Sequence, residues 1–143
     1  MRRFIFVILF INASAFADTI DNYMNIVNNI PVMEMKADPQ AQAWARSARN
    51  VLTITCESIA ETLTETNEQA KHQGRPLFCL TNNTQLNPAI MNELIQETYK
   101  ELSSQPNDKD KMTVSQVALL AISKRYPCQS NKEMVQLQSL MAR

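Results

Sequence analysis

Three cysteines are the residues whose spacing predicts a defined chemistry in this sequence. Cys79 and Cys128 lie 49 positions apart, and each ends a run of apolar residues and a proline, in 76–79 and 126–128. In an oxidising compartment such thiols can pair, and closing a loop of this length stabilises a fold by about 4 kcal/mol in the chain-entropy model. We therefore predict a Cys79–Cys128 disulfide.

Cys56 is the third cysteine. It lies between Leu52 and Ile59 in a segment with helical periodicity, where a buried free thiol is the expected state. A pairing of Cys56 with Cys79 is the alternative that the sequence leaves open.

The other polar residues do not form a recognisable catalytic or metal-binding pattern. His72 is the single histidine and has no nucleophile or orienting acid beside it, and no CxxC motif is present. A zinc site would need about four ligands at short spacings. Four glutamates follow each other at helical steps, as on a solvated helix face: Glu57, Glu61, Glu65 and Glu68. We expect a non-enzymatic protein without metal or cofactor.

The first residues have the pattern of a secretory signal peptide. Arg2 and Arg3 precede an apolar run over 4–11, which is too short to span a bilayer. Ala15 and Ala17 then offer small side chains at a cleavage site. We expect cleavage after residue 17, a periplasmic location that permits disulfides, and a single domain over 18–143.

Charge argues against two classes of partner. The full chain has equal numbers of basic and acidic side chains, and removing residues 1–17 takes away two arginines. The mature chain is therefore weakly acidic and has no basic run, which disfavours nucleic acid and anionic membrane surfaces as partners. No second apolar stretch is long enough for membrane insertion after cleavage.

The mature chain predicts an all-α fold, because it has few aromatic residues and a single glycine. Thr19 can cap a first helix. Apolar residues follow it at helical spacing: Ile20, Tyr23, Met24 and Val27. We expect Pro31 to end this helix and residues 32–37 to form a connector.

Residues 39–73 predict one long helix, which begins at the capping carboxylate of Asp38 and at Pro39. Its apolar stripe has steps of three and four: Trp44, Ala48, Val51, Leu52, Thr55, Ile59 and Leu63. The β-branched residues at 53–55 permit a kink.

Beyond Leu63 this long helix becomes polar, so we expect its end to project into solvent. Gly74 and Pro76 then end it in the usual order.

Three further helices complete the expected fold. Asn87 and Pro88 begin one that ends near Ser103, and a polar loop over 104–111 follows. Thr113 and Gln116 form a capping box for the next, which is apolar on nearly all sides and should lie at the centre of the core. Ser130 and Glu133 begin a last short helix through Met141. The sequence thus predicts a small bundle of about four to five helices, one of them long, closed by a disulfide.

Part of this pattern resembles a known family. The run Phe78-Cys79-Leu80, an amphipathic helix, a polar loop with proline, and Val117–Ile122 ending in Tyr126-Pro127-Cys128 are similar to the Rap/Tai family of type VI secretion immunity proteins. The resemblance covers residues 48–128, although the stretch 55–61 lacks the two glycines that the family often has there. It implies a small periplasmic helical protein that binds and blocks a cognate peptidoglycan amidase effector.

The expected function is therefore immunity-type inhibition of a toxin by steric occupation of its cleft. The alternative is an accessory component of a conjugation or secretion apparatus. In either case we expect a protein partner, and a homodimer is possible for such a scaffold. The candidate partner-binding residues lie at the end of the long helix and in the turn after it: Glu65, Glu68, Lys71, His72, Arg75, Asn82 and Asn83, with the 105–111 loop as a second candidate.

Overall fold

The structure is a computed structural model that describes residues 19–81, 84–102 and 111–128. Within these ranges the chain forms four α-helices and no strand, with one isolated bridge between Thr19 and Thr113. The helices are α1 (Ile20–Glu34), α2 (Pro39–His72), α3 (Pro88–Leu102) and α4 (Val114–Arg125). The predicted all-α class is confirmed, while the short helix expected over 130–141 lies outside the described residues.

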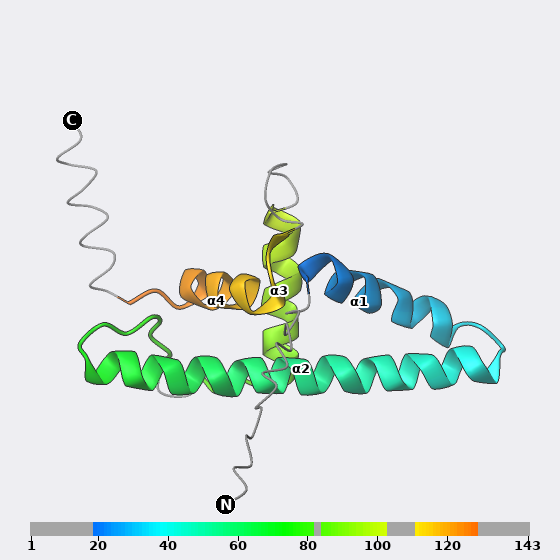
Figure 1. The fold of residues 1–143 in the computed structure, drawn as a ribbon, viewed down its shortest axis with the longest axis horizontal. Helices are drawn as coiled ribbons and strands as arrows, with labels where there is room; N and C mark the ends of the chain where they lie inside the picture. The colour runs from blue at the N-terminus through cyan, green and yellow to red at the C-terminus, as the bar shows by residue number, and fades with distance from the viewer. Residues whose placement is uncertain (1–18, 82–83, 103–110, 129–143) are drawn as a thin grey trace, which may run out of the picture.

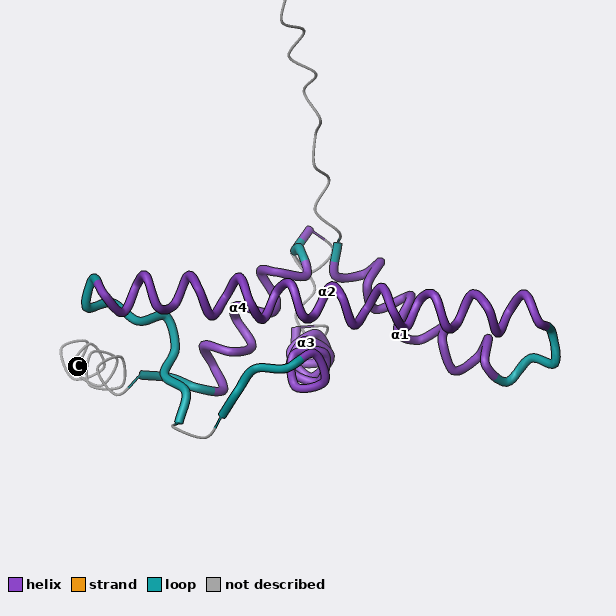
Figure 2. The backbone as a smooth tube through the Cα atoms, turned by 90° about the horizontal axis from the view of Figure 1, so that it is seen from below, coloured by secondary structure: helices purple, strands orange, loops and turns teal. Residues whose placement is uncertain are grey.

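Helix α2 is the base on which the other helices are arranged. Its 34 residues give a length of about 50 Å. α1 lies over its N-terminal half, α4 lies over its C-terminal half, and α3 stands across it between them (Figure 1). Figure 2 shows α3 end-on while α2 runs across the view, so the two helices cross steeply. No kink occurs at 53–55, because α2 is one continuous helix.

Side-chain caps fix where the helices begin, as the sequence predicts. Asp38 accepts hydrogen bonds from the amides of Gln40 and Ala41 at 3.1 and 3.3 Å. Thr113 and Gln116 form the reciprocal capping box of α4. These bonds satisfy amides that have no partner within the helix.

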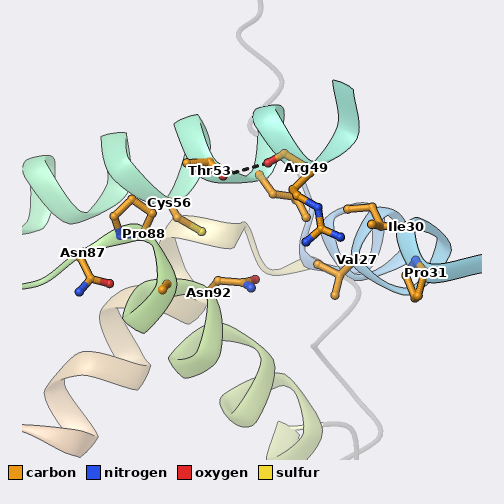
Figure 3. Close-up of a pocket in the computed structure, with 11 residues that line it drawn as sticks. Val27, Ile30, Pro31, Arg49, Thr53, Cys56, Asn87, Pro88 and Asn92 are labelled. Atoms are coloured by element: carbon orange, nitrogen blue, oxygen red, sulfur yellow. Dashed lines mark hydrogen bonds between the residues drawn. The ribbon is translucent and has the colours of Figure 1, made fainter. Parts of the chain in front are cut away.

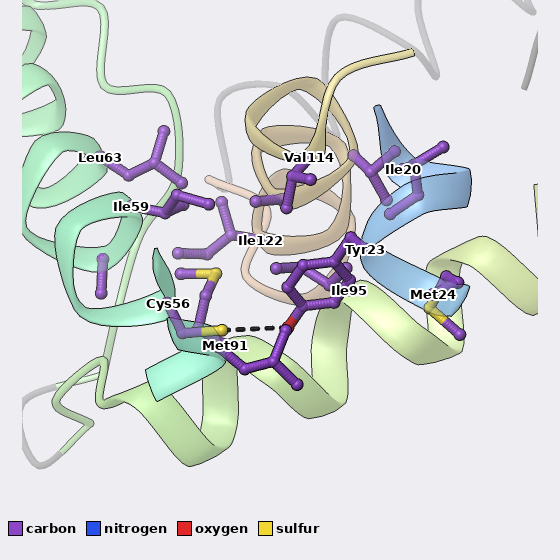
Figure 4. Packing of buried hydrophobic residues seen from close by; sticks show 14 of the residues in the cluster. Ile20, Tyr23, Met24, Cys56, Ile59, Leu63, Met91, Ile95, Val114 and Ile122 are labelled. Carbon is purple, nitrogen blue, oxygen red and sulfur yellow. Dashed lines mark hydrogen bonds between the residues drawn. The ribbon is translucent and has the colours of Figure 1, made fainter. Parts of the chain in front are cut away.

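The core lies where the four helices meet (Figure 4). Aromatic, branched and sulfur-containing side chains from every helix fill it and are almost fully buried: Ile20, Tyr23, Cys56, Phe78, Met91, Ile95, Val117 and Ile122. α4 does supply central residues, but Leu120 on its outer side is 42 % exposed. α4 is therefore amphipathic in its packing, although its sequence is apolar on nearly all sides.

The buried face of α2 differs from the predicted stripe in its first half. Trp44 and Val51 are 41 % and 53 % exposed, whereas Ala41, Ala45 and Ala48 face the protein. Because these alanines are small, the backbone of α1 can approach α2 closely along this stretch. The small size of the alanines, rather than the greater hydrophobicity of Trp44 and Val51, therefore determines which face of α2 is buried here.

Pro31 does not end the first helix, contrary to expectation. α1 continues to Glu34, and the Met35 amide donates to the Pro31 carbonyl at 3.2 Å. Pro31 itself removes one backbone hydrogen bond. Burial of Ile30 against the core holds this last turn in place, and Glu34 also forms an exposed ion pair with Arg49 on α2 at 2.5 Å.

The predicted disulfide is present. Cys79 and Cys128 are bridged with their Cα atoms 4.9 Å apart, and the Cys79 amide also donates to the Tyr126 carbonyl at 2.8 Å. Cys56 is a buried free thiol, so its alternative pairing with Cys79 is ruled out here. The bridge joins the chain just after α2 to the chain just after α4.

We predict that Cys79→Ser lowers the free energy of unfolding by about 4 kcal/mol, because the unfolded chain loses its loop constraint. Urea unfolding followed by circular dichroism measures the change. Cys56→Ser is the control and should cost much less, since it leaves the disulfide intact. Equal losses for both variants, or a Cys56-containing bridge in non-reducing peptide mapping, would contradict the assignment.

Candidate partner-binding surface

Asn67 holds the chain that returns from the end of α2. Its side-chain oxygen accepts from the amides of Leu77 and Phe78 at 2.8 and 3.1 Å, and its amide nitrogen donates to the Phe78 carbonyl at 3.0 Å. Asn67 is only 7 % exposed. One buried side chain thus satisfies three backbone groups of the segment 76–80, which we call the return segment.

This contact corrects the expectation that α2 projects into solvent after Leu63. Asn67 lies one turn beyond Leu63 on the buried face, and Phe78 of the return segment is 1 % exposed against it. Only the final turns of α2 remain uncovered. The helix then ends as expected, because Gly74 adopts φ +73° and the Arg75 amide donates to the Ala70 carbonyl at 2.9 Å.

A groove runs between α2 and the chain that leads into α3. It has a volume of about 700 Å³. Three glutamates of α2, one helical turn apart, line one side: Glu57, Glu61 and Glu65. The other side is apolar or uncharged and is lined by Leu80, Thr84, Gln85, Leu86 and Pro88. We call this the acidic groove, since none of the residues that line it carries a positive charge.

A smaller hollow of about 180 Å³ adjoins the acidic groove near the disulfide. Glu68, Lys71 and Cys79 line it together with the buried Asn67. Glu68 and Lys71 form an ion pair at 3.5 Å, with side chains 54 % and 64 % exposed. An ion pair this exposed adds little stability, so both side chains are free to exchange partners at low cost.

The structure brings together several of the predicted partner-binding residues. Glu65 lines the acidic groove, and Glu68 and Lys71 line the adjoining hollow. Gln85, which the prediction did not name, lines the same groove as Glu65. His72 and Arg75 are exposed at the end of α2 but line neither. Asn82, Asn83 and residues 105–110 lie outside the described residues. We call Glu65–Arg75 together with Thr84 and Gln85 the end surface.

A third hollow, of about 630 Å³, lies between α1, α2 and the start of α3 (Figure 3). Its lining is mainly apolar, from Val27, Ile30 and Leu52, with Arg49 at the α1 side. Arg49 is already paired with Glu34 at 2.5 Å.

Cys56 and Asn92 also line this hollow and meet Tyr23 in a buried network. The Tyr23 hydroxyl donates to Asn92 Oδ1 at 2.7 Å. The single proton of the Tyr23 hydroxyl is used in this hydrogen bond. The Cys56 thiol is therefore the donor in the 3.1 Å contact between Cys56 and Tyr23. Burial raises the pKa of Cys56. Burial also raises the pKa of Tyr23.

The chemistry open to these surfaces is recognition through charge and hydrogen bonds. Cys56 is held protonated, and a thiol in that state is a poor nucleophile. The described ranges contain no group of three or more His, Cys, Asp or Glu arranged to hold a metal ion. Within the same ranges, no helix has the length and apolar character needed to cross a bilayer.

Comparisons with protein-family models, with curated proteins and with solved structures gave no match to the chain. The resemblance to the Rap/Tai family therefore stays a prediction from the sequence.

We predict that Asn67→Ala lowers the free energy of unfolding by about 2–4 kcal/mol, because two amides and one carbonyl of the return segment lose their partner. Asn50→Ala is a matched control on an exposed position of the same helix and should change stability by less than about 0.5 kcal/mol. Hydrogen exchange should also accelerate at Leu77 and Phe78 in the Asn67 variant. Unchanged exchange there would contradict the role of Asn67.

We also predict that stability falls as the pH rises above about 8.5, the ordinary pKa of a thiol. The raised pKa keeps Cys56 protonated in the folded state, whereas the unfolded thiol ionises, so alkaline pH favours unfolding. Urea unfolding at pH 7.5, 8.5 and 9.5 measures this trend. Cys56→Ser should show a shallower decline, and equal declines would contradict the assignment.

Proposed function

We propose that this protein is a periplasmic, non-enzymatic immunity-type protein that binds a toxin and blocks it sterically. The partner suggested by the family resemblance is a peptidoglycan amidase effector of type VI secretion. The observation that carries the proposal is the end surface, which combines exposed charged side chains with a backbone fixed by Asn67 and the disulfide.

Rigidity at the end surface favours tight binding. The Cys79–Cys128 bridge lies a few residues from Arg75, and Asn67 bonds the return segment directly to α2. A surface held in this way loses little conformational entropy when a partner binds it. Loss of the bridge is therefore expected to weaken binding as well as stability.

The end surface carries charges of both signs, from Glu65, Glu68, Lys71 and Arg75, and so suits a partner whose cleft also carries both signs at its rim. Glu65 lies in the acidic groove, and Glu68 can exchange its exposed contact with Lys71 for a cation of the partner. Such charge-assisted hydrogen bonds are about twice as strong as neutral ones. The last turn of α2 would enter the cleft, and the apolar side of the groove would exclude water around these bonds.

The expected partner is encoded beside the gene for this protein. We would produce the neighbouring gene product in the periplasm of a sensitive host, with and without this protein, and purify the complex. Protection of the host together with complex formation supports the proposal. A neighbouring set of transfer or secretion genes, with no toxic product, would contradict it and favour the accessory role.

We predict that Glu68→Ala, Lys71→Ala and Arg75→Ala together abolish protection and weaken binding by at least about tenfold, because several charge-assisted bonds are lost. Isothermal titration calorimetry with the purified toxin measures the affinity, and circular dichroism verifies the fold.

The matched control replaces Glu93 and Glu97 by Ala, since both are exposed carboxylates on α3. This control should bind normally. If the triple variant folds and still protects, or if the α3 control loses binding to the same extent, the end surface is not the interface.

A further inference from the structure

The hollow between α1, α2 and the start of α3 has the size and lining of a small-molecule site. Its volume of about 630 Å³ lies within the range of roughly 300–1,000 Å³ that is usual for such sites. Ile30, Leu52 and Cys56 line it and are at most 9 % exposed, so we call these three residues the floor. A ligand in this hollow therefore buries an apolar body against the floor.

The polar side chains around the floor offer hydrogen-bond donors and no carboxylate. None of the described residues that line the hollow is acidic, whereas Arg49 of α2 and Asn92 of α3 both provide N–H groups. Figure 3 shows the Arg49 guanidinium and the Asn92 amide extending from the two helices toward the same gap beside Val27. The hollow therefore suits a group that accepts hydrogen bonds and carries negative charge.

The orientation of Asn92 is set by the buried hydroxyl of Tyr23. This hydroxyl donates to Asn92 Oδ1 at 2.7 Å, and Tyr23 is only 1 % exposed. Oδ1 is thus engaged by the core, and the two N–H groups on Nδ2 have no acceptor among the described residues. Asn92 is half-buried, so water can satisfy these donors in the free protein. A ligand oxygen that replaces the water meets an amide that is already oriented for it.

Arg49 can contact a ligand although it pairs with Glu34. The pair uses Nη2 of the guanidinium, at 2.5 Å, and leaves the donors on Nε and Nη1. The two side chains are 60 % and 42 % exposed, so the pair is weak and can rearrange at low cost. Glu34 is not among the residues that line the hollow. Its carboxylate therefore competes with a ligand for Arg49 from outside the hollow.

We propose that this hollow binds a small apolar molecule with one carboxylate, of the class of a medium-chain fatty acid. The apolar chain lies on the floor, and the carboxylate accepts hydrogen bonds from Asn92 Nδ2 and from Arg49. None of the residues that line the hollow belongs to the end surface. The inference therefore does not depend on the toxin, and either proposal can fail without the other.

Isothermal titration calorimetry of the full mature chain with decanoate tests the ligand class. Decanoate should bind saturably with one molecule per chain. Decanol should bind at least about tenfold more weakly, because it keeps the apolar contact and loses the charge-assisted bonds. Decyltrimethylammonium should not bind, because its cation meets Arg49. Absence of saturable decanoate binding, or equal binding of the three probes, would overturn the proposal.

Two arginines on α2 provide a matched comparison. Arg49→Gln should weaken decanoate binding by about tenfold or more. Arg46→Gln should bind as the wild type does, since Arg46 is exposed on the same helix and does not line the hollow. Glu34→Gln should strengthen binding several-fold, because it removes the competing carboxylate. Equal effects of the two arginine variants, or weaker binding by Glu34→Gln, would contradict the role of Arg49.

Asn92→Asp tests the amide with a side chain of the same shape. The new carboxylate still accepts from Tyr23, but it replaces the two N–H donors by an oxygen and should abolish decanoate binding. Asn50→Asp is the control, since it adds the same charge at an exposed position of α2. Circular dichroism verifies the fold of both variants. Decanoate binding that survives in a folded Asn92→Asp variant would overturn the proposal.

Nuclear magnetic resonance of the wild type locates the ligand without any substitution. The side-chain amide signals of Asn92 should shift as decanoate is added, and the backbone signals of Glu65–Arg75 should not. Shifts confined to the end surface, or an unchanged Asn92 signal at saturation, would place decanoate elsewhere and overturn the assignment of this hollow.

Discussion

The fold depends on the attachment of the return segment to the C-terminal third of α2. A 34-residue helix has one buried face and needs a cover along most of it. α1 covers the N-terminal half, but the polar C-terminal part offers little apolar area for packing. The buried side chain of Asn67 and the Cys79–Cys128 bridge replace that missing apolar contact, one by hydrogen bonds and the other by a covalent link.

This attachment also determines what the surface can do. With the return segment fixed, Leu80 and residues 84–88 lie beside the glutamates of α2 and line the acidic groove. The final turn of α2 stays exposed beyond it. A charged surface thus rests on a rigid support, which is the arrangement expected of a protein that binds another protein.

Local signals in the sequence predicted much of this architecture. Caps and prolines located the helix starts at Asp38, Asn87 and Thr113, and cysteine spacing identified the bridge. Contacts between distant segments were harder to predict. Asn67 lies in a polar run, and only its position one turn after Leu63 on the apolar stripe could have indicated burial. Trp44 appeared to be a core residue because the sequence does not reveal that α1 packs on the neighbouring alanines.

The account holds that the end surface, supported by Asn67 and the disulfide, is where a toxin binds. Hydrogen exchange of the protein alone and in complex with the product of the neighbouring gene tests this most directly. The account predicts slower exchange in peptides that cover Glu65–Arg75 and 84–88, and unchanged exchange in α1. Protection confined to α1 or α3, with the end of α2 exchanging as in the free protein, would contradict it.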